Sequence, residues 1–206
     1  QGKISGLVMA NNGSANAGTS IQLRGMTSIN AGKSPLIVID GFPGGDIRSL
    51  NQDDIKSIDV LKDASAGAIY GTRAASGVIL ITTKSGSNTN GKVKLTYSTE
   101  LTKKQDYGKP DMLTADEYRE HQVGIDYGDN VDWWDELINH DNFSQKHHLA
   151  LEAGTENAQI YTSFFYENNE GIAIQDSRQD YGGRLNANFK LFDGWLEIRP
   201  NVDYRQ

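Results

Sequence analysis

The second half of the chain alternates apolar and polar residues in long runs, and this pattern predicts extended strands. In the clearest run, residues 181–191, the apolar set is Leu185, Ala187, Phe189 and Leu191, and the polar set is Arg184, Asn186, Asn188 and Lys190. Successive side chains of a strand point to opposite faces, so such a strand has one apolar and one polar face. Five segments are predicted as strands: 92–103, 143–153, 160–167, 181–191 and 195–205.

The length of these strands indicates whether their apolar face contacts lipid or a protein core. Each has roughly 10 residues, which is enough to cross an outer membrane when the strand is tilted. A strand of a soluble sandwich is usually about half as long. A soluble antiparallel sheet gives the same alternation, so length is the better discriminator. We therefore expect lipid on the apolar face and a wet lumen on the polar face.

The connections between these strands alternate in length. Residues 154–157 and the pair Asp193–Gly194 are short turns, whereas residues 105–142 and 168–180 are long links. Outer-membrane barrels have short periplasmic turns and long extracellular loops, so both long links are assigned to the extracellular side. Within the first, Thr114 and Glu117 have capping-box spacing and predict a helix over residues 114–123.

The first half has a different pattern, typical of a small α+β domain over residues 1–84. Ile4, Leu7 and Val8 predict one face of a short helix in residues 1–10. Residues 20–24, 36–39, 58–61 and 78–83 are predicted strands, and residues 51–55 and 64–70 short helices. Asn51 and Asp63 are the predicted N-caps, and Gly71 ends the second helix. Residues 85–91, rich in Ser, Gly and Asn, form a linker to the strands of residues 92–206.

Four sequence blocks in the first half resemble the plug-domain signature of SusC/RagA-type TonB-dependent outer-membrane receptors. They are IQLRG at 21–25, PLIVIDG at 35–41, VLKDAS at 60–65 and IYGTRAASGVI at 69–79. The resemblance implies a plug domain followed by antiparallel strands of an incomplete transmembrane β-barrel. Five strands cannot close a barrel with a plugged lumen, which has about 22. The first part of the plug and most of the wall are thus expected to lie outside this sequence.

Composition excludes several classes of function. The net charge of −7 and the pI of about 5.1 argue against nucleic acid as a partner. No apolar stretch reaches the ~18 residues of a spanning helix. The chain has no cysteine and shows no catalytic or cofactor-binding constellation. His147 and His148 point to opposite faces of a strand and cannot share a metal ion, and Asp53–Asp54 is interpreted as part of a solvated acidic loop.

One group of residues has the character of a ligand contact. Trp133 and Trp134 lie beside Asp132, and aromatic faces flanked by carboxylates suit sugars or peptides. The favoured alternative is that the two rings pack onto the mouth of the barrel or lie in an interfacial aromatic belt.

A second group is expected to hold the plug in place. Arg24 and Arg73 lie at element ends of the plug, and a buried arginine needs a carboxylate partner. Asp40, Asp59, Asp63 and acids of the barrel wall are the candidate partners. When a plug is held by such polar pairs, water can replace each partner, so an applied force can move the plug. A dry apolar contact between plug and wall would resist such movement.

The resemblance also implies a function and partners. It implies TonB-dependent active transport of a large oligosaccharide or peptide across the bacterial outer membrane, with the plug gating the barrel. The implied partners are the TonB complex of the inner membrane, a SusD-like surface lipoprotein and outer-membrane lipid. A non-transporting surface-binding or adhesion barrel remains an alternative, as does a soluble secreted binding protein. An enzyme is not expected.

Overall fold

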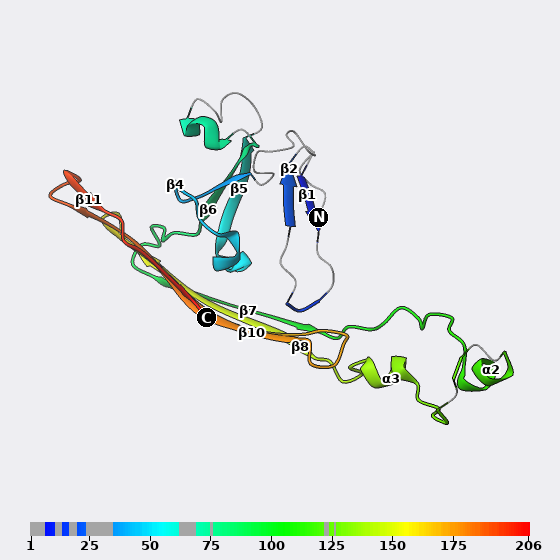
Figure 1. Cartoon of the computed structure of the whole chain (residues 1–206). Coiled ribbons are helices and arrows are strands. Elements are labelled where there is room, and N and C mark those ends of the chain that lie inside the picture. The colour runs from blue at the N-terminus through cyan, green and yellow to red at the C-terminus, as the bar shows by residue number, and fades with distance from the viewer. Residues whose placement is uncertain are drawn as a thin grey trace.

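Two bodies make up the fold: a large antiparallel sheet, and a smaller N-terminal unit that lies against one of its faces (Figure 1). The structure is a computed structural model. It describes residues 7–10, 14–16, 20–23, 35–61, 69–74, 76–121, 124–125 and 127–206.

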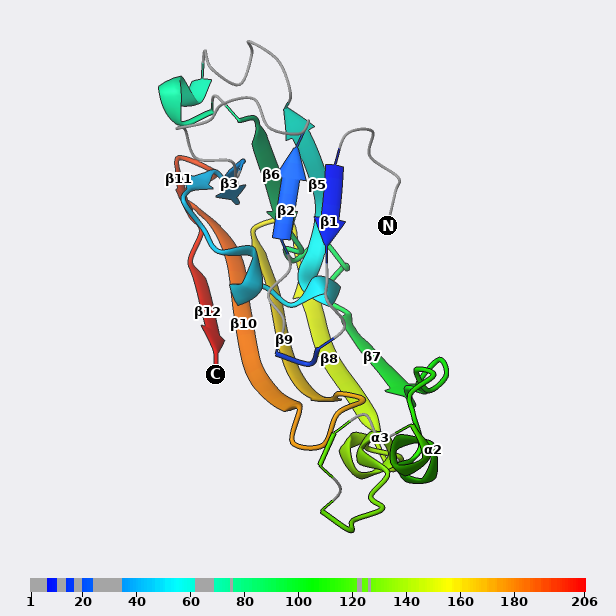
Figure 2. The ribbon, with the colours of Figure 1, turned by 45° about the vertical axis from the view of Figure 1, so that its right-hand side comes forward.

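The large sheet consists of long neighbouring strands in chain order (Figure 2). Its strands are β7 (Val93–Thr102), β8 (Ser144–Gly154), β9 (Ala158–Glu170), β10 (Ser177–Leu191), β11 (Leu196–Ile198) and β12 (Asn201–Arg205). Each of β7 to β10 pairs antiparallel with the next, and β11 and β12 both pair with β10. Short links suffice between such neighbours, since antiparallel strands need no crossover.

The two faces of the large sheet have opposite chemistry. The inner face, which meets the N-terminal unit, buries polar side chains such as Arg184, which is only 4% exposed. The outer face exposes apolar side chains such as Leu185, which is 37% exposed. Further exposed residues of this face are Val93, Leu95, Leu149, Phe164, Phe189, Leu196, Ile198 and Val202. A sheet in water buries its apolar face instead, so the outer face has the character predicted for contact with lipid.

The N-terminal unit is built on a four-stranded sheet of order β4-β3-β6-β5. Its strands are β3 (Leu36–Ile39), β4 (Phe42–Pro43), β5 (Ile55–Leu61) and β6 (Val78–Thr83), and its single-turn helices are η1 (Ile47–Ser49), η2 (Gln52–Asp54) and η3 (Gly71–Ala74). Strands β3 and β6 are parallel, and the other pairs are antiparallel. The β-branched residues Val38, Val78, Ile79 and Ile81 form its buried centre, as the apolar runs predict.

A long excursion between β7 and β8 carries two short helices, α2 (Ala115–Glu120) and α3 (Trp133–Leu137). Both lie beyond one end of the large sheet (Figure 1), which we call the loop end; the opposite end, with residues 155–157 and 192–195, is the turn end. The predicted capping box of Thr114 and Glu117 is present, but the helix ends at Glu120. None of the helices within the described ranges combines the length and the hydropathy of a membrane-spanning segment.

The prediction of a helix in residues 1–10 is wrong. Leu7–Ala10 is a strand, β1, paired antiparallel with β2 (Ser20–Leu23). Three apolar residues in ten specify a helix only weakly, and pairing with a second strand outweighs such a local preference. The predicted helix over residues 64–70 lies largely outside the described residues, together with its N-cap Asp63.

Two details of the predicted strands also differ. The last strand is divided into β11 and β12 at Arg199–Pro200, because proline has no N–H for the ladder. The link predicted over residues 168–180 is mostly strand, since Ser177 to Asp180 pair with Glu170 to Glu167. Only residues 171–176 form the connection. The polar composition of these strand ends resembled that of a loop.

The opposite chemistry of the two faces predicts opposite responses to charge. In the full-length protein, Leu185→Lys should lower the free energy of unfolding from lipid vesicles by about 2–4 kcal/mol, because it exposes an ammonium group to hydrocarbon. Asn188→Lys, on the inner face of the same strand, is the matched control and should change it by less than about 1 kcal/mol. Urea titration of both variants measures the change in the free energy of unfolding. Equal losses would contradict the assignment of the faces.

Candidate functional site

One contact between the two bodies centres on Asp54, which is 2% exposed. The side chain of Asn51 caps η2 by accepting the Asp53 N–H at 2.8 Å, and Asp54 ends this turn. Oδ1 of Asp54 accepts hydrogen bonds from His148 Nε2 and from the Tyr161 hydroxyl, both at 2.8 Å. Oδ2 accepts one from the Ser163 hydroxyl, also at 2.8 Å. Three side chains of the large sheet thus converge on one carboxylate of the N-terminal unit.

The environment of Asp54 favours its charged form. Burial by itself raises the pKa of Asp54, but hydrogen bonds from His148, Tyr161 and Ser163 together outweigh it, so the pKa lies below the ordinary 3.8. A carboxylate that accepts several hydrogen bonds is stabilised against protonation. We conclude that Asp54 is ionised at neutral pH and that its charge is balanced by donors of the sheet.

A second contact joins Asp40 of the N-terminal unit to Arg184 of β10. Asp40 lies in the two-residue turn between β3 and β4, where its φ is 49° and that of Gly41 is 89°, a geometry that hairpin turns favour. Its carboxylate accepts the Thr83 N–H at 2.8 Å and the Thr83 hydroxyl at 2.6 Å. Arg184 Nη2 then donates to Asp40 Oδ2 at 2.9 Å and to Thr83 Oγ1 at 3.0 Å.

The second contact continues along the inner face of β10 and β12. Asn186 Nδ2 donates to Thr83 Oγ1 at 3.2 Å and to the Lys84 carbonyl at 2.6 Å. Asn201 Nδ2 donates to Asp40 Oδ2 at 3.1 Å. Buried charges are stable only when paired and hydrogen-bonded, and both conditions hold for Arg184.

Further polar contacts lie around these two. Lys146 Nζ is 3.0 Å from Asp53 Oδ2. Arg205 donates to the carbonyls of Arg48 at 2.6 Å and Leu50 at 3.2 Å. The contact between the two bodies is therefore made largely of hydrogen bonds and ion pairs.

The residues expected to hold the plug lie in different settings. Asp40 pairs with Arg184 of the sheet. Asp59 is an exposed residue of β5 whose Oδ2 lies 3.4 Å from the Ser57 hydroxyl. Arg73 is exposed in η3, and Arg24 lies outside the described residues.

Sequence reasoning missed the part played by Asp54 and its three partners. It interpreted Asp53–Asp54 as a solvated loop, but the structure buries Asp54 and leaves Asp53 half-buried at the edge. The available signal was on the sheet, where Arg184, His148 and Ser163 all lie on the polar face of alternating strands. Which plug residue they meet depends on how the two bodies dock, and no local pattern contains that information.

The tryptophan pair lies on α3 in the excursion. Asp132 caps this helix by accepting the N–H groups of Trp134 at 3.1 Å and Asp135 at 3.3 Å, and it also pairs with Lys109. The hydrogen bond from Lys109 is the main reason that the pKa of Asp132 lies below its ordinary value. Trp133 is 68% exposed, whereas Trp134 Nε1 donates to Asp106 at 3.4 Å. Of the two rings, that of Trp133 is thus the more available for contact.

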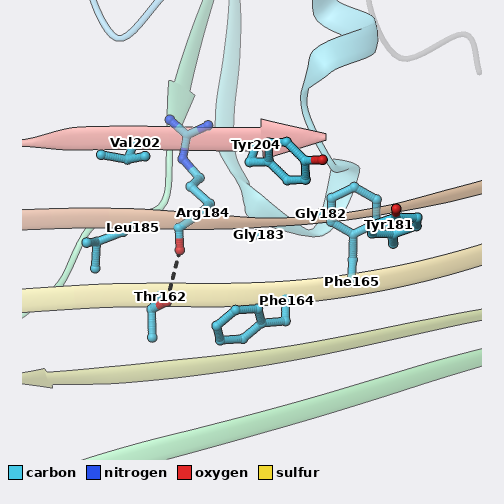
Figure 3. A pocket seen from close by; sticks show the side chains of 10 residues that line it. All are labelled: Thr162, Phe164, Phe165, Tyr181, Gly182, Gly183, Arg184, Leu185, Val202 and Tyr204. Carbon is cyan, nitrogen blue, oxygen red and sulfur yellow. Dashed lines mark hydrogen bonds between the residues drawn. The ribbon is translucent and has the colours of Figure 1, made fainter. Parts of the chain in front are cut away.

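The outer face has an apolar groove of about 620 Å³. It lies around Gly183 of β10, between the neighbouring strands β9 and β12. Phe164, Leu185, Val202 and Tyr204 line it, and Arg184 points to the opposite side of the sheet from Leu185 and Phe164 (Figure 3). A Cβ at Gly183 would lie 3.1 Å from Phe164 Cδ1. Because glycine has no side chain, it leaves this part of the groove open and avoids close contact with Phe164.

His147 and His148 lie on opposite faces, as the strand period predicts. His148 meets Asp54, whereas His147 stacks between Tyr97 and Tyr166 on the outer face, with ring centroids 6.2 and 6.5 Å away. Within the described part of the chain, no group of three or more His, Cys, Asp or Glu side chains has the geometry of a metal site.

The central position of Asp54 predicts a large effect of its removal. In the full-length protein, Asp54→Ala should weaken the attachment of the N-terminal unit by on the order of 3 kcal/mol, because three buried donors lose their acceptor. Asp53→Ala, which breaks only the half-exposed pair with Lys146, should cost less than about 1 kcal/mol. Hydrogen exchange of the Lys84 amide follows both effects, because its bond to the Asp54 carbonyl lies within the N-terminal unit beside this contact and gains access to water when the unit detaches. Equal protection in both variants would contradict the role of Asp54.

The lowered pKa of Asp54 predicts a dependence on acid. The stability that ionised Asp54 gives to the contact is complete above the unfolded-state pKa of about 3.9. It is lost as the pH falls through the lower folded-state pKa. Protection of the Lys84 amide, corrected for intrinsic exchange, should therefore fall below about pH 4 in the natural protein. In Asp54→Asn this acid-dependent loss should be absent. The same loss in both proteins would show that another group is responsible.

Known proteins match both bodies. The family model described as the TonB-dependent receptor plug domain matches residues 1–78. The TonB-dependent receptor SusC of Bacteroides thetaiotaomicron is 33% identical over 98% of this chain and 22% of its own length. The TonB-dependent receptor P3 of Formosa agariphila is 37% identical over 88% of this chain and 18% of its own. The chain thus spans about a fifth of these curated relatives.

Solved structures agree with the sequence comparisons. The RagAB peptide importer in its closed-closed state superposes with a TM-score of 0.85 at 25% identity, covering 100% of this chain and 28% of that one. Its open-open state gives a TM-score of 0.83. Members of this family are receptors of the bacterial outer membrane and not enzymes. The chain belongs to the SusC/RagA-type TonB-dependent outer-membrane receptors and carries their plug together with antiparallel strands of an unclosed barrel wall.

Proposed function

We propose that the protein is a TonB-dependent active transporter that brings a large nutrient across the outer membrane. In this proposal residues 1–84 are the plug, residues 85–91 a linker, and residues 92–206 the opening strands and loops of the barrel wall. The single observation that carries it is the large sheet, whose apolar face is exposed while its polar face is covered by the N-terminal unit. A wall of this kind encloses a polar passage, and a unit on its inner face obstructs that passage.

The orientation follows from the two ends of the sheet. We assign the loop end, with residues 103–143 and 171–176, to the outside and the turn end to the periplasm. Two groups of aromatic residues, one toward each end of the sheet, support this assignment. Tyr97, Tyr166 and Tyr181 lie toward the loop end, and the exposed Phe192 and Trp195 lie in the last turn. Ten residues of tilted strand separate Tyr181 from Leu191, or about 25 Å, the height of an apolar band between aromatic girdles.

The polar contact between plug and wall suits a gate that must open. The buried wall residues that hydrogen-bond to the plug include His148, Tyr161, Ser163, Arg184 and Asn186. Their hydrogen bonds with the plug can be replaced by bonds with water as the plug moves, so separation costs less than opening a dry apolar seal of the same area. Force applied by the TonB complex to the periplasmic side of the plug would break these contacts in turn.

Substrate and partners are proposed from the relatives. The similar RagAB structure is that of a peptide importer, so a peptide is one candidate cargo, and an oligosaccharide is the other. A SusD-like lipoprotein would cover the external face. The exposed ring of Trp133, beside Asp132 and Trp134 on the same external excursion, is the candidate cargo contact. Such a ring offers an apolar surface to either a sugar ring or a peptide side chain.

The test of transport is uptake by cells with and without a working TonB. Cells that carry the full-length receptor should accumulate labelled nutrient only when TonB is functional. Uptake that persists unchanged without TonB would contradict active transport. Binding without uptake in either strain would favour a surface-binding or adhesion protein.

A cross-link between plug and wall tests the gate itself. Thr83 Oγ1 and Asn186 Nδ2 are 3.2 Å apart, and this chain contains no native cysteine. The double variant Thr83→Cys with Asn186→Cys should lose uptake under oxidising conditions and regain it with a reductant, because a disulfide prevents the plug from leaving the wall. Each single cysteine variant is the control. Undiminished uptake by the fully cross-linked receptor would contradict a moving plug.

A further inference from the structure

The excursion that carries α3 is joined to the connection between β9 and β10. Ile138, just after α3, forms an isolated antiparallel bridge with Ala173. The Asn139 N–H donates to the Ile172 carbonyl at 2.6 Å, and the Ile174 N–H donates to the Leu137 carbonyl at 3.0 Å. Two segments more than thirty residues apart thus form one backbone-paired element, which we call the rim: α3 with residues 138–139 and 171–176.

The rim is shaped so that Asp176 faces the plug. The Gly171 N–H donates to the Asp176 carbonyl at 2.6 Å, and the Asp176 N–H donates to the Ala173 carbonyl at 3.2 Å. Gln175, immediately before Asp176, has a φ of 64°. A Cβ at Gly171 would lie 2.1 Å from Asp176 Oδ2, so glycine is required there. The loop geometry therefore fixes where this carboxylate lies.

Asp176 is bound by three consecutive residues of the plug. Its Oδ1 accepts from the Ser14 hydroxyl at 3.0 Å and from Asn16 Nδ2 at 3.1 Å, and its Oδ2 accepts from the Ala15 N–H at 2.9 Å. Asn16 Nδ2 also lies 3.3 Å from the Ser177 carbonyl. The hydrogen bond from the Ala15 N–H is the main reason that the pKa of Asp176 lies below its ordinary value. One rim side chain thus meets the plug tip, residues 14–16.

We propose that Asp176 is a positioning residue that ties the plug tip to the rim, so that a ligand which displaces the rim releases the tip. The proposal rests on the proposed function, because it assigns the rim to the external side where cargo arrives. The tie is separate from the Asp54 and Asp40 contacts, which hold the body of the plug. Its donors are uncharged and Asp176 is only half-buried, so a small movement of the rim suffices to exchange these hydrogen bonds for bonds with water.

The Ala15 amide reports this tie directly, because its own N–H is the donor. In the full-length receptor, Asp176→Ala should speed hydrogen exchange of the Ala15 amide by about tenfold or more, while the Lys84 amide at the Asp54 contact keeps its protection. Asp141→Asn, an exposed acid of the same external region, is the control and should change neither amide. Unchanged exchange at Ala15 in Asp176→Ala would overturn the proposal.

Two further variants separate coupling from a merely local contact. Gly171→Ala keeps the charge but displaces the carboxylate, so it should also speed exchange at Ala15. Asn139→Pro removes the donor that joins the α3 side of the rim to Ile172 and leaves Asp176 in place. If the rim acts as one element, exchange at Ala15 rises in Asn139→Pro as well. A rise in Asp176→Ala with none in Asn139→Pro would refute transmission from α3 to the tip.

The exchange experiment and the uptake test can each refute one proposal without refuting the other. A receptor whose uptake depends on TonB but whose Ala15 amide is unaffected by Asp176→Ala retains the proposed function and refutes the tie. A receptor whose uptake is independent of TonB refutes the proposed function, whatever the exchange data are. With both correct, Asp176→Ala should keep TonB-dependent uptake and change the half-saturating nutrient concentration, because the plug tip responds to the rim differently.

Discussion

The polar inner face of the large sheet is the constraint on which the rest of the structure depends. A wall whose outer face meets hydrocarbon must keep its polar side chains on the other side, and those side chains need partners there. On β10, Arg184 and Asn186 reach the plug at Asp40, Thr83 and Lys84. On the neighbouring strands β8 and β9, His148, Tyr161 and Ser163 donate to Asp54. The plug is thus held by polar side chains of the wall that need hydrogen-bond partners outside the wall in order to be buried.

The same contacts explain how a tightly fitted plug remains movable. A buried ion pair such as Arg184 with Asp40 contributes little net stability, since desolvation offsets most of the attraction, but it specifies one docked arrangement strongly. An apolar contact of equal area would stabilise closure more and would resist the entry of water. A polar contact therefore combines a well-defined closed state with a modest cost of opening. The rim adds a third point of attachment at the plug tip through Asp176.

The sequence predicts the wall better than it predicts the plug contact. The alternation in residues 181–191 identifies both faces of β10, because the period of a strand is fixed by its backbone geometry. The turn at Asp40–Gly41 and the capping box at Thr114 are likewise local and are confirmed. By contrast, Leu7–Ala10 is a strand because it pairs with β2, whose residues lie 10 to 16 positions further along the chain. The partners of Asp54 and Asp176 are about 94 to 162 residues distant, beyond the reach of any local rule.

The central claim is that the outer face meets lipid while the inner face meets the plug. Single nitroxide labels at Leu185 and at Asn186, neighbours on one strand, test it most directly in the full-length receptor in lipid vesicles. We expect oxygen dissolved in the bilayer to relax the label at position 185, and we expect the label at position 186 to be shielded from it. If position 186 is the more accessible to oxygen and position 185 is shielded, the assignment of the two faces is wrong.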